Sequence, residues 1–299
     1  MTNGRCKKKD MKKKNYLKKG VALALMLFTM QSSFAGGPWL FKKNEGFIQT
    51  SVVLPAYAYS SLLMGTLRET QEVNRKTHNS DYSIYLEYGI TDKLNVISTL
   101  PFKYVKTDDL TDGFSPTNLL EDGDLGGISN YKLALKYGII DAKVKVALSL
   151  QTSWNTIKQD LDKGLSTGYD ANSYGLMLHI GRSKEKQYGF LEVGYNLFSN
   201  NYSDAIELKI EHGWKLSDHF YLAGSLDGRF SMHNGSYNNE NLKQTGLSPN
   251  DQEWAYFGVK VAYEKDNGFG INANMPLVPI TFKYVGFNGA IGFGAYKKF

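Results

Sequence analysis

The sequence predicts an all-β protein, a transmembrane antiparallel up-and-down β-barrel of about 12 strands. Three observations predict it. The chain opens with the pattern of a secretory signal, most of the rest alternates apolar and polar residues, and the connections between these strands alternate between short and long. Residues 83–105 show the pattern, because SIYLEYGITDKLNVISTLPFKYV gives two alternating strands around a Thr-Asp-Lys turn.

Residues 1–35 are expected to form a cleavable signal peptide. The first 20 residues contain nine lysines and arginines and one acidic residue, and an apolar run, residues 21–30, follows directly. Ser33 and Ala35 provide the small residues expected before a cleavage site. At about 1.5 Å per residue, the apolar run is too short to cross a bilayer core of about 30 Å as a helix. The mature protein is then residues 36–299, expected as one barrel domain.

Removing the signal changes the charge of the protein. The whole chain has 35 basic and 29 acidic residues, and the signal holds nine and one of these, which leaves 26 basic and 28 acidic residues. A mature protein without a basic excess is not expected to bind nucleic acid. Cys6 is the single cysteine and leaves with the signal, so disulfides, thiolate zinc sites and thiol catalysis are excluded.

Alternating strands recur along the mature chain. Apolar residues take every second position in segments such as 130–137, 144–154, 174–180 and 189–197. No apolar stretch of the mature chain reaches the roughly 18 residues of a membrane helix. A closed barrel lets the apolar faces contact lipid and pairs every strand edge, as lipid requires. A soluble secreted β-sandwich is the alternative, because its strands also alternate.

The lengths of the connections predict the topology. Short turns are expected near residues 90–93, 139–143, 183–187, 215–219 and 264–268, long polar connections near 55–80, 106–127, 155–172 and 233–251, and shorter ones near 199–204 and 276–282. With Gly46–Leu54 as the first strand and Tyr284–Phe299 as the last, the number of strands is even. Both chain ends then lie on the side of the short turns, and the long connections face the outside of the cell.

Three segments resemble a known family. YGITDKLNVISTLPF (Tyr88–Phe102), DGDLGG (Asp122–Gly127) and LALKYGI (Leu133–Ile139) resemble elements of the outer-membrane proteins grouped as the "MetA pathway of phenol degradation" family. The resemblance covers about residues 46–155. It implies a barrel that passes small, often apolar or aromatic, compounds across the outer membrane of a Gram-negative cell, and it implies no catalytic or binding residues.

The end of the chain predicts the partners of the barrel. The last segment, YVGFNGAIGFGAYKKF, is an aromatic strand whose final residue is Phe299. It resembles the closing strand of outer-membrane barrels, which serves as their insertion signal. We therefore expect the barrel-assembly machinery to act on the strand that ends at Phe299, and outer-membrane lipid and lipopolysaccharide to surround the barrel.

The lumen is the candidate functional site. A 12-stranded barrel falls between eight-stranded barrels, which side chains fill, and sixteen-stranded ones, which hold a water channel. Strand alternation points the following charged residues inward as a predicted pore lining: Glu87, Lys132, Lys136, Lys145, Glu192, Glu207, Lys209, Glu211, Asp227 and Arg229. We expect a porin-like channel or transporter for small, apolar or aromatic solutes. If these charges pair and fill the lumen, the protein is instead a structural or adhesion barrel that acts through its extracellular loops.

Catalytic and metal sites are not expected. SMHNGS, residues 231–236, is the only stretch with a hint of nucleophilic chemistry, and a loop-based outer-membrane lipase that uses His233 is the remaining alternative. An EF-hand counted from Asp122 puts Leu133 at the position that needs Glu. The five histidines have no metal-ligand spacing. We therefore expect no cofactor and no enzymatic activity.

Overall fold

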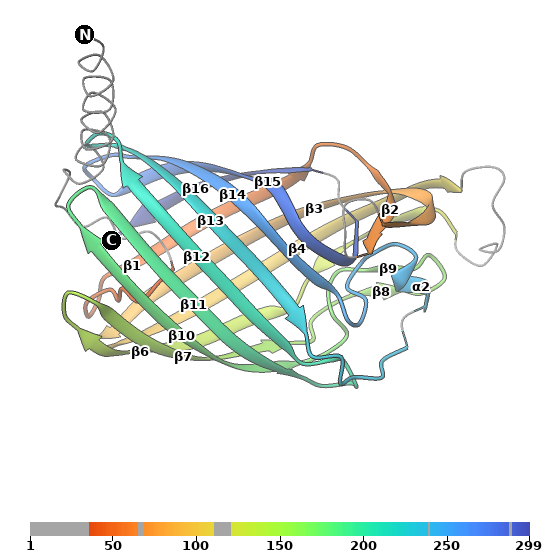
Figure 1. Ribbon diagram of the computed structural model, residues 1–299, viewed down its shortest axis with the longest axis horizontal. Coiled ribbons are helices and arrows are strands. Elements are labelled where there is room, and N and C mark those ends of the chain that lie inside the picture. The colour runs from red at the N-terminus through yellow and green to blue at the C-terminus, as the bar shows by residue number, and fades with distance from the viewer. Residues whose placement is uncertain (1–35, 65–68, 111–120, 239, 287–288) are drawn as a thin grey trace, which may run out of the picture.

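The computed structural model describes residues 36–64, 69–110, 121–238, 240–286 and 289–299. They form an almost entirely β structure whose strands build one cylinder (Figure 1). The cylinder strands are β1 (Gly46–Pro55), β3 (Thr70–Thr91), β4 (Leu94–Leu110), β6 (Tyr131–Asp141), β7 (Lys145–Trp154), β10 (Ser173–Lys184), β11 (Gln187–Phe198), β12 (Ala205–Lys215), β13 (Phe220–Ser231), β14 (Glu253–Glu264), β15 (Phe269–Gly286) and β16 (Ala290–Lys298).

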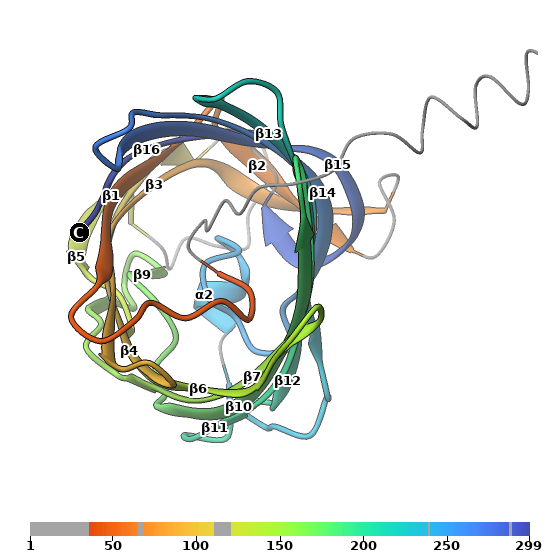
Figure 2. The same ribbon diagram turned by 90° about the vertical axis from the view of Figure 1, so that its left-hand side faces the viewer.

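The cylinder is a closed antiparallel barrel of 12 strands, as predicted. Each cylinder strand pairs with the next one along the chain, and the last pairs with the first. The ladder between β1 and β16 includes Phe47↔Lys298, and the ladder between β1 and β3 includes Gly46↔Tyr88. Closure pairs the edge N–H and C=O groups that lipid cannot satisfy. Figure 2 looks along the barrel and shows the ring.

The short turns lie at one end of the barrel and the longer connections at the other (Figure 1). The predicted short turns are confirmed, since residues 92–93, 142–144, 185–186, 216–219 and 265–268 are all that separate the strands there. The carboxyl end of the chain lies at this short-turn end. Gly46 N donates to the carbonyl oxygen of Phe299 at 2.7 Å, and Phe299 N donates to the carbonyl oxygen of Gly46 at 3.0 Å.

Two of the expected long loops contain more strand than predicted. β2 (Tyr59–Met64) and the first part of β3 occupy much of 55–80, and the end of β4 with β5 (Gly123–Ile128) occupies part of 106–127. β2 pairs with β3 and β15, and β5 pairs with β4, so the wall is extended at the long-loop end. The prediction of loops was wrong here because these strand extensions lack a regular alternation of apolar and polar residues.

Three small elements lie in the other two long connections. They are β8 (Gln159–Asp160), β9 (Leu165–Ser166) and the four-residue helix α2 (Glu240–Lys243). Seen along the barrel, α2 lies within the outline of the ring (Figure 2). Over the described part of the chain, no helix has the length and apolar character to cross a membrane.

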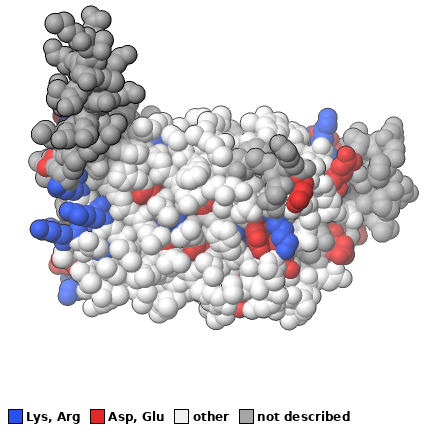
Figure 3. Space-filling model, in the orientation of Figure 1, with Lys and Arg blue, Asp and Glu red and all other residues white. Residues whose placement is uncertain are grey.

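The two faces of a barrel strand differ as the alternation predicts. On β3, the side chains of Tyr82 and Ile84 are 44% and 49% exposed, whereas Glu87, on the opposite face, is 1% exposed. Figure 3 shows a mostly uncharged band across the middle of one side of the barrel, with charged side chains gathered toward its two ends. An apolar band of this kind fits a hydrocarbon layer, and the polar face is turned to the lumen.

Pro101 lies opposite a break in the neighbouring strands. β4 pairs with β6 as far as Thr99↔Lys132 and with β5 from Phe102↔Ile128, and residues 129–130 interrupt the partner between them. The carbonyl oxygen of Pro101 accepts a hydrogen bond from Ser129 N at 2.9 Å. Proline has no backbone N–H and cannot donate to a β-ladder. The break in the neighbouring strands therefore leaves no unpaired N–H group at Pro101.

The last two strands differ from the prediction. Residues 276–282 belong to β15 rather than to a connection, and β16 begins at Ala290 rather than at Tyr284. This stretch contains Pro276 and a second proline three residues later, and proline is common in turns, so the local pattern does not mark it as strand. Among the described residues, the ladder of β15 with β16 ends at Asn274↔Gly292, so these prolines remove no bond from it.

Candidate functional site

The lumen contains a chamber of about 740 Å³ in the middle of the barrel. Its wall carries residues from all 12 cylinder strands, and both charged and aromatic groups line it. Eight of the ten predicted pore-lining residues line this chamber: Lys132, Lys136, Glu192, Glu207, Lys209, Glu211, Asp227 and Arg229. Strand alternation thus finds the residues that surround the chamber.

The other two predicted pore residues lie beside the chamber or away from it. Glu87 lies on the inner face of the wall but is buried beside the chamber, where its Oε1 lies 2.6 Å from Lys136 Nζ. Lys145 lies near the short-turn end, where its ammonium pairs with the exposed carboxylate of Asp141. Lys145 is therefore a residue of the barrel rim.

A segment before β1, residues 36–45, enters the lumen from the short-turn end, and Figure 2 shows it crossing the opening. Polar bonds fix it to the wall. Gly37 N donates to Glu192 Oε1 at 2.6 Å, and Lys136 Nζ donates to the carbonyl oxygen of Gly37 at 3.4 Å. The segment narrows the lumen at this end, and we call it the inner segment.

Aromatic packing also holds the inner segment in place. The Trp39 ring meets the rings of Tyr188 and Phe190 edge to face, with centroids 6.0 Å and 5.9 Å apart. Gly37 has φ +74°, and a Cβ on it would lie 2.4 Å from the Trp39 ring. The turn that brings Trp39 against the wall therefore requires glycine at position 37.

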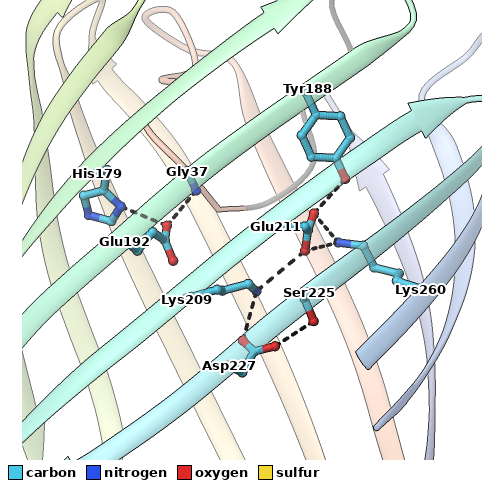
Figure 4. Close-up of polar contacts among 9 residues, drawn as sticks. All are labelled: Gly37, His179, Tyr188, Glu192, Lys209, Glu211, Ser225, Asp227 and Lys260. Carbon is cyan, nitrogen blue, oxygen red and sulfur yellow. Dashed lines mark hydrogen bonds and ion pairs between the residues drawn. The ribbon is translucent and has the colours of Figure 1, made fainter. Parts of the chain in front are cut away.

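Four charged side chains of three adjacent strands form a network on the barrel wall (Figure 4). Lys209 Nζ lies 3.9 Å from Glu211 Oε2 and 3.9 Å from Asp227 Oδ1. Lys260 Nζ lies 2.9 Å from both oxygens of Glu211, which also accepts a hydrogen bond from the Tyr188 hydroxyl at 2.7 Å. Each charge of the network thus has an opposite charge nearby, which offsets the cost of removing the buried Glu211 and its partly buried partners from water.

A second polar chain connects the wall to the inner segment. His179 Nδ1 lies 2.9 Å from Glu192 Oε1, and His179 Nε2 lies 2.8 Å from the hydroxyl of Ser149. Glu192 is the same residue that accepts the hydrogen bond from Gly37 N. A shift of the inner segment would therefore remove a hydrogen bond from Glu192, the partner of His179, and another from Lys136.

The long connections obstruct the opposite end of the lumen. Leu165 of β9 and Leu247, which follows α2, pack with Val105 of β4 in a buried apolar cluster. Thr245 Oγ1 donates to the carbonyl oxygen of Gly164 at 2.9 Å, which joins the two connections. We call these inward-folded connections the outer loops.

The stretch proposed for a lipase does not form a triad. His233 Nε2 lies 2.6 Å from Glu253 Oε1 and its Nδ1 lies 3.3 Å from Asp251 Oδ1, so both ring nitrogens face carboxylates. The Ser231 hydroxyl donates to Asp251 at 2.9 Å instead of to the imidazole. A nucleophile needs the base within hydrogen-bond reach, and among the described residues no serine hydroxyl has that position at His233.

The sequence-based reasoning missed several residues of the site. Lys260, His179 and Ser149 all line the chamber but were not predicted. The signal was present for Lys260, because it stands between Val259 and Val261 in an alternating strand. No alternation marks the inner segment, so its place in the lumen could not be found this way. Within the described residues, no cluster of His, Cys, Asp and Glu could hold a metal ion.

Comparison with solved structures agrees with this architecture. An outer-membrane channel from Pseudomonas putida F1 matches with a TM-score of 0.65 and 14% identity, over 90% of this chain and 100% of that one. The fold is that of an outer-membrane β-barrel. Two further outer-membrane barrels are more distant. The NanC porin matches with a TM-score of 0.47 and 7% identity, over 84% of this chain and 98% of that one. The Pseudomonas putida toluene transporter TodX matches with a TM-score of 0.43 and 9% identity, over 91% of this chain and 95% of that one. No protein-family model and no curated protein sequence matches this chain.

Proposed function

We propose that the protein is an outer-membrane channel that passes small solutes through the barrel lumen. The observation that carries the proposal is the chamber of about 740 Å³ lined by charged and aromatic side chains. Sites for small molecules commonly have about 300–1,000 Å³, with a few polar groups among apolar ones. The similarity in fold to a solved outer-membrane channel is consistent with it.

The preferred solutes are small molecules with an apolar or aromatic part. The chamber wall supports this proposal, because Tyr85, Tyr169, Phe198 and Tyr256 line it together with the charged groups. Aromatic faces bind flat apolar groups with little loss of side-chain freedom. The sequence resemblance over residues 46–155 supports the same class of solute.

Passage requires that the obstructions at both ends move. The inner segment is the better candidate for a gate, since it is a short piece of chain before β1 and contains no residue of a barrel strand. Its backbone bonds to the wall lie at its end, where Asn44 N donates to Gly89 O and Gly89 N donates to Glu45 O, each at 2.9 Å. The outer loops are held by more contacts, including the cluster of Leu165, Leu247 and Val105. A structure with the inner segment in place corresponds to a mostly closed channel.

A structural or adhesion barrel is the second candidate. The observation in its favour is the pairing of the lumen charges, above all Lys136 with Glu87 and Lys209 with Glu211 and Asp227. Such pairs make the interior rigid without requiring transport. In this case the exposed parts of the outer loops would carry the activity.

The route to the membrane is part of the proposal. Residues 1–35, which lie outside the described residues, direct secretion through the inner membrane and are removed, so residues 36–299 form the mature barrel. The assembly machinery then inserts the barrel through the strand that ends at Phe299, and lipid and lipopolysaccharide surround the apolar band.

Flux into liposomes tests the channel directly. Purified mature protein is reconstituted and the swelling of the liposomes is followed in isotonic arabinose, raffinose or dextran. We expect swelling to be faster than in protein-free liposomes and to fall as the solute grows. Equal rates with and without protein, in samples whose barrel is shown to be folded by heat-modifiable migration on gels, would favour the structural barrel.

A further inference from the structure

Arg229 is a buried cation with an unusual environment. It lies near the end of β13 and lines the chamber, and its side chain is 9% exposed. The guanidinium carbon lies 4.4 Å from the centre of the Tyr169 ring and 4.8 Å from that of Phe198. Tyr169 belongs to an outer loop and Phe198 ends β11, so two separate elements enclose the guanidinium.

No carboxylate of the described chain pairs with this guanidinium. Its Nε is buried and has no hydrogen-bond partner. One acidic candidate is Glu207, the register partner of Arg229 on β12, which lines the same chamber but forms no ion pair with it among the described contacts. Two other deeply buried cations have partners: Lys136 has Glu87 at 2.6 Å, and Arg75 donates to the carbonyl oxygens of Glu121 and Lys163. Among the described contacts, the Arg229 guanidinium has neither a carboxylate nor a carbonyl partner.

A buried cation without an anion is costly, because its interactions with water are lost and no charge replaces them. The aromatic faces supply part of the compensation, since cation–π contacts stabilise a desolvated guanidinium. They also hold the planar group in one orientation. A fixed guanidinium presents two parallel N–H donors that match a carboxylate.

We propose that Arg229 binds the anionic group of the transported solute, and that the solute is a small organic acid with a carboxylate and an aromatic or similarly flat apolar part. The carboxylate lies on the guanidinium, and the ring lies beside Tyr169 and Phe198. This inference rests on the proposed channel function and adds the chemical class of the solute.

Glu207 limits how tightly the anion is held. Its carboxylate belongs to the same part of the wall, so it repels the bound anion and competes for the guanidinium when the ligand leaves. A transport site must bind its solute strongly enough to admit it and weakly enough to release it. A single carboxylate fits this wall better than a doubly charged anion.

Binding of benzoate to the full mature chain tests the proposal. The purified protein is equilibrated with benzoate at pH 7 and titrated by calorimetry, and benzamide serves as the neutral probe of the same shape. We expect benzoate to bind more tightly than benzamide. Arg229→Gln should weaken benzoate binding at least tenfold and leave benzamide binding unchanged.

Arg182→Gln is the matched control, because Arg182 lies at the short-turn end of β10 and does not line the chamber. Arg182→Gln should bind benzoate like the parent. Arg229→Lys should retain part of the affinity, because lysine keeps the positive charge but lacks the paired N–H donors of the guanidinium. Heat-modifiable migration verifies that each variant is folded. Unchanged benzoate affinity in folded Arg229→Gln, or no benzoate binding by the parent, would overturn the proposal.

The test separates this inference from the channel function. Liposomes that swell in arabinose while Arg229→Gln binds benzoate normally would leave the channel standing and refute the anion site. Benzoate binding that depends on Arg229 in a protein that gives no swelling would refute the channel and leave the site as a binding pocket.

Discussion

Lys136 Nζ and Glu87 Oε1 lie 2.6 Å apart inside the barrel, and each of the two side chains is only 1% exposed. Glu87 accepts a further hydrogen bond from Asn95 Nδ2 at 2.7 Å, so the pair is supported by the strand between them. Lys136 also donates to the inner segment through the carbonyl oxygen of Gly37. The pair therefore connects the stability of the wall with the position of the inner segment.

Replacing Lys136 with Met should destabilise the barrel. The substitution leaves Glu87 buried and without its cation, which typically costs about 3–5 kcal/mol. Urea unfolding of the purified protein in lipid vesicles, followed by tryptophan fluorescence, measures the loss. The double variant Lys136→Met, Glu87→Leu should recover most of it, because no buried charge remains.

The control for this comparison is Lys186→Met, since Lys186 is exposed in the turn between β10 and β11. It should unfold like the parent. A midpoint for Lys136→Met equal to that of the control would mean that the pair contributes nothing to stability.

Replacing Lys209 with Glu should shift the ion selectivity of any conducting state toward cations. The new carboxylate would join Glu211 and Asp227, which now lie 3.9 Å from the ammonium, and charges that line a narrow lumen set selectivity. The reversal potential of bilayer currents in a tenfold KCl gradient measures the shift. Lys186→Glu makes the same change of charge outside the lumen and serves as the control. An equal shift of the reversal potential in this control would show that the chamber charges do not set the ion selectivity.

Acid should loosen the outer loops around Asp251. Burial acts to raise the pKa of Asp251, but the hydrogen bonds that Ser203 and Ser231 donate at 2.6 Å and 2.9 Å hold it below the ordinary value. A lowered pKa means stabilisation that is full above the ordinary value, near pH 4, and is lost as the pH falls through the lower one.

Hydrogen exchange of peptides from residues 231–252, corrected for intrinsic rates, measures this loosening. Protection should be constant from pH 7 to pH 5 and fall below pH 4, and Asp251→Asn should lose it already at pH 7. Asp218→Asn changes an aspartate whose side chain is 94% exposed in a short turn and should have no effect. Equal protection in the two variants would show that Asp251 does not hold the loops.

Cysteine labelling on whole cells tests the orientation. Ser236 is exposed in a long connection and Asp266, 97% exposed, lies in a short turn at the other end of the barrel. An impermeant maleimide should label Ser236→Cys on intact cells and Asp266→Cys only after lysis. The reverse pattern would invert the topology. Positions 111 and 239, which the sequence also suggests for labelling, lie outside the described residues.

The wall of the barrel was predictable because alternation is a local property. Tyr82 and Ile84 face outward and Glu87 inward as their positions in the strand require, and the same count places Lys209 and Asp227 at the chamber. The even number of strands followed from the connection lengths. Errors arose where local rules compete, as at Pro276, which resembles a turn residue but lies within β15.

The contents of the lumen were not predictable in the same way. Gly37 and Glu192 are 155 residues apart in the chain, and their hydrogen bond depends on the closed barrel. The stacking of Tyr169 and Phe198 on Arg229 likewise joins a loop to two strands. Alternation indicates that a side chain points inward, but the partner it meets there is decided by the tertiary structure.

Single-channel recording of the mature protein and of a variant that lacks residues 36–45 tests the central claim most directly. The inner segment crosses the lumen through its contacts with Glu192, Lys136, Tyr188 and Phe190. Its removal takes away the backbone bonds of Asn44 and Glu45 with Gly89 but no residue of a barrel strand. In planar bilayers we expect small or infrequent openings from the parent and a larger, steady conductance from the folded variant. A folded variant that conducts no more than a protein-free bilayer would contradict the channel.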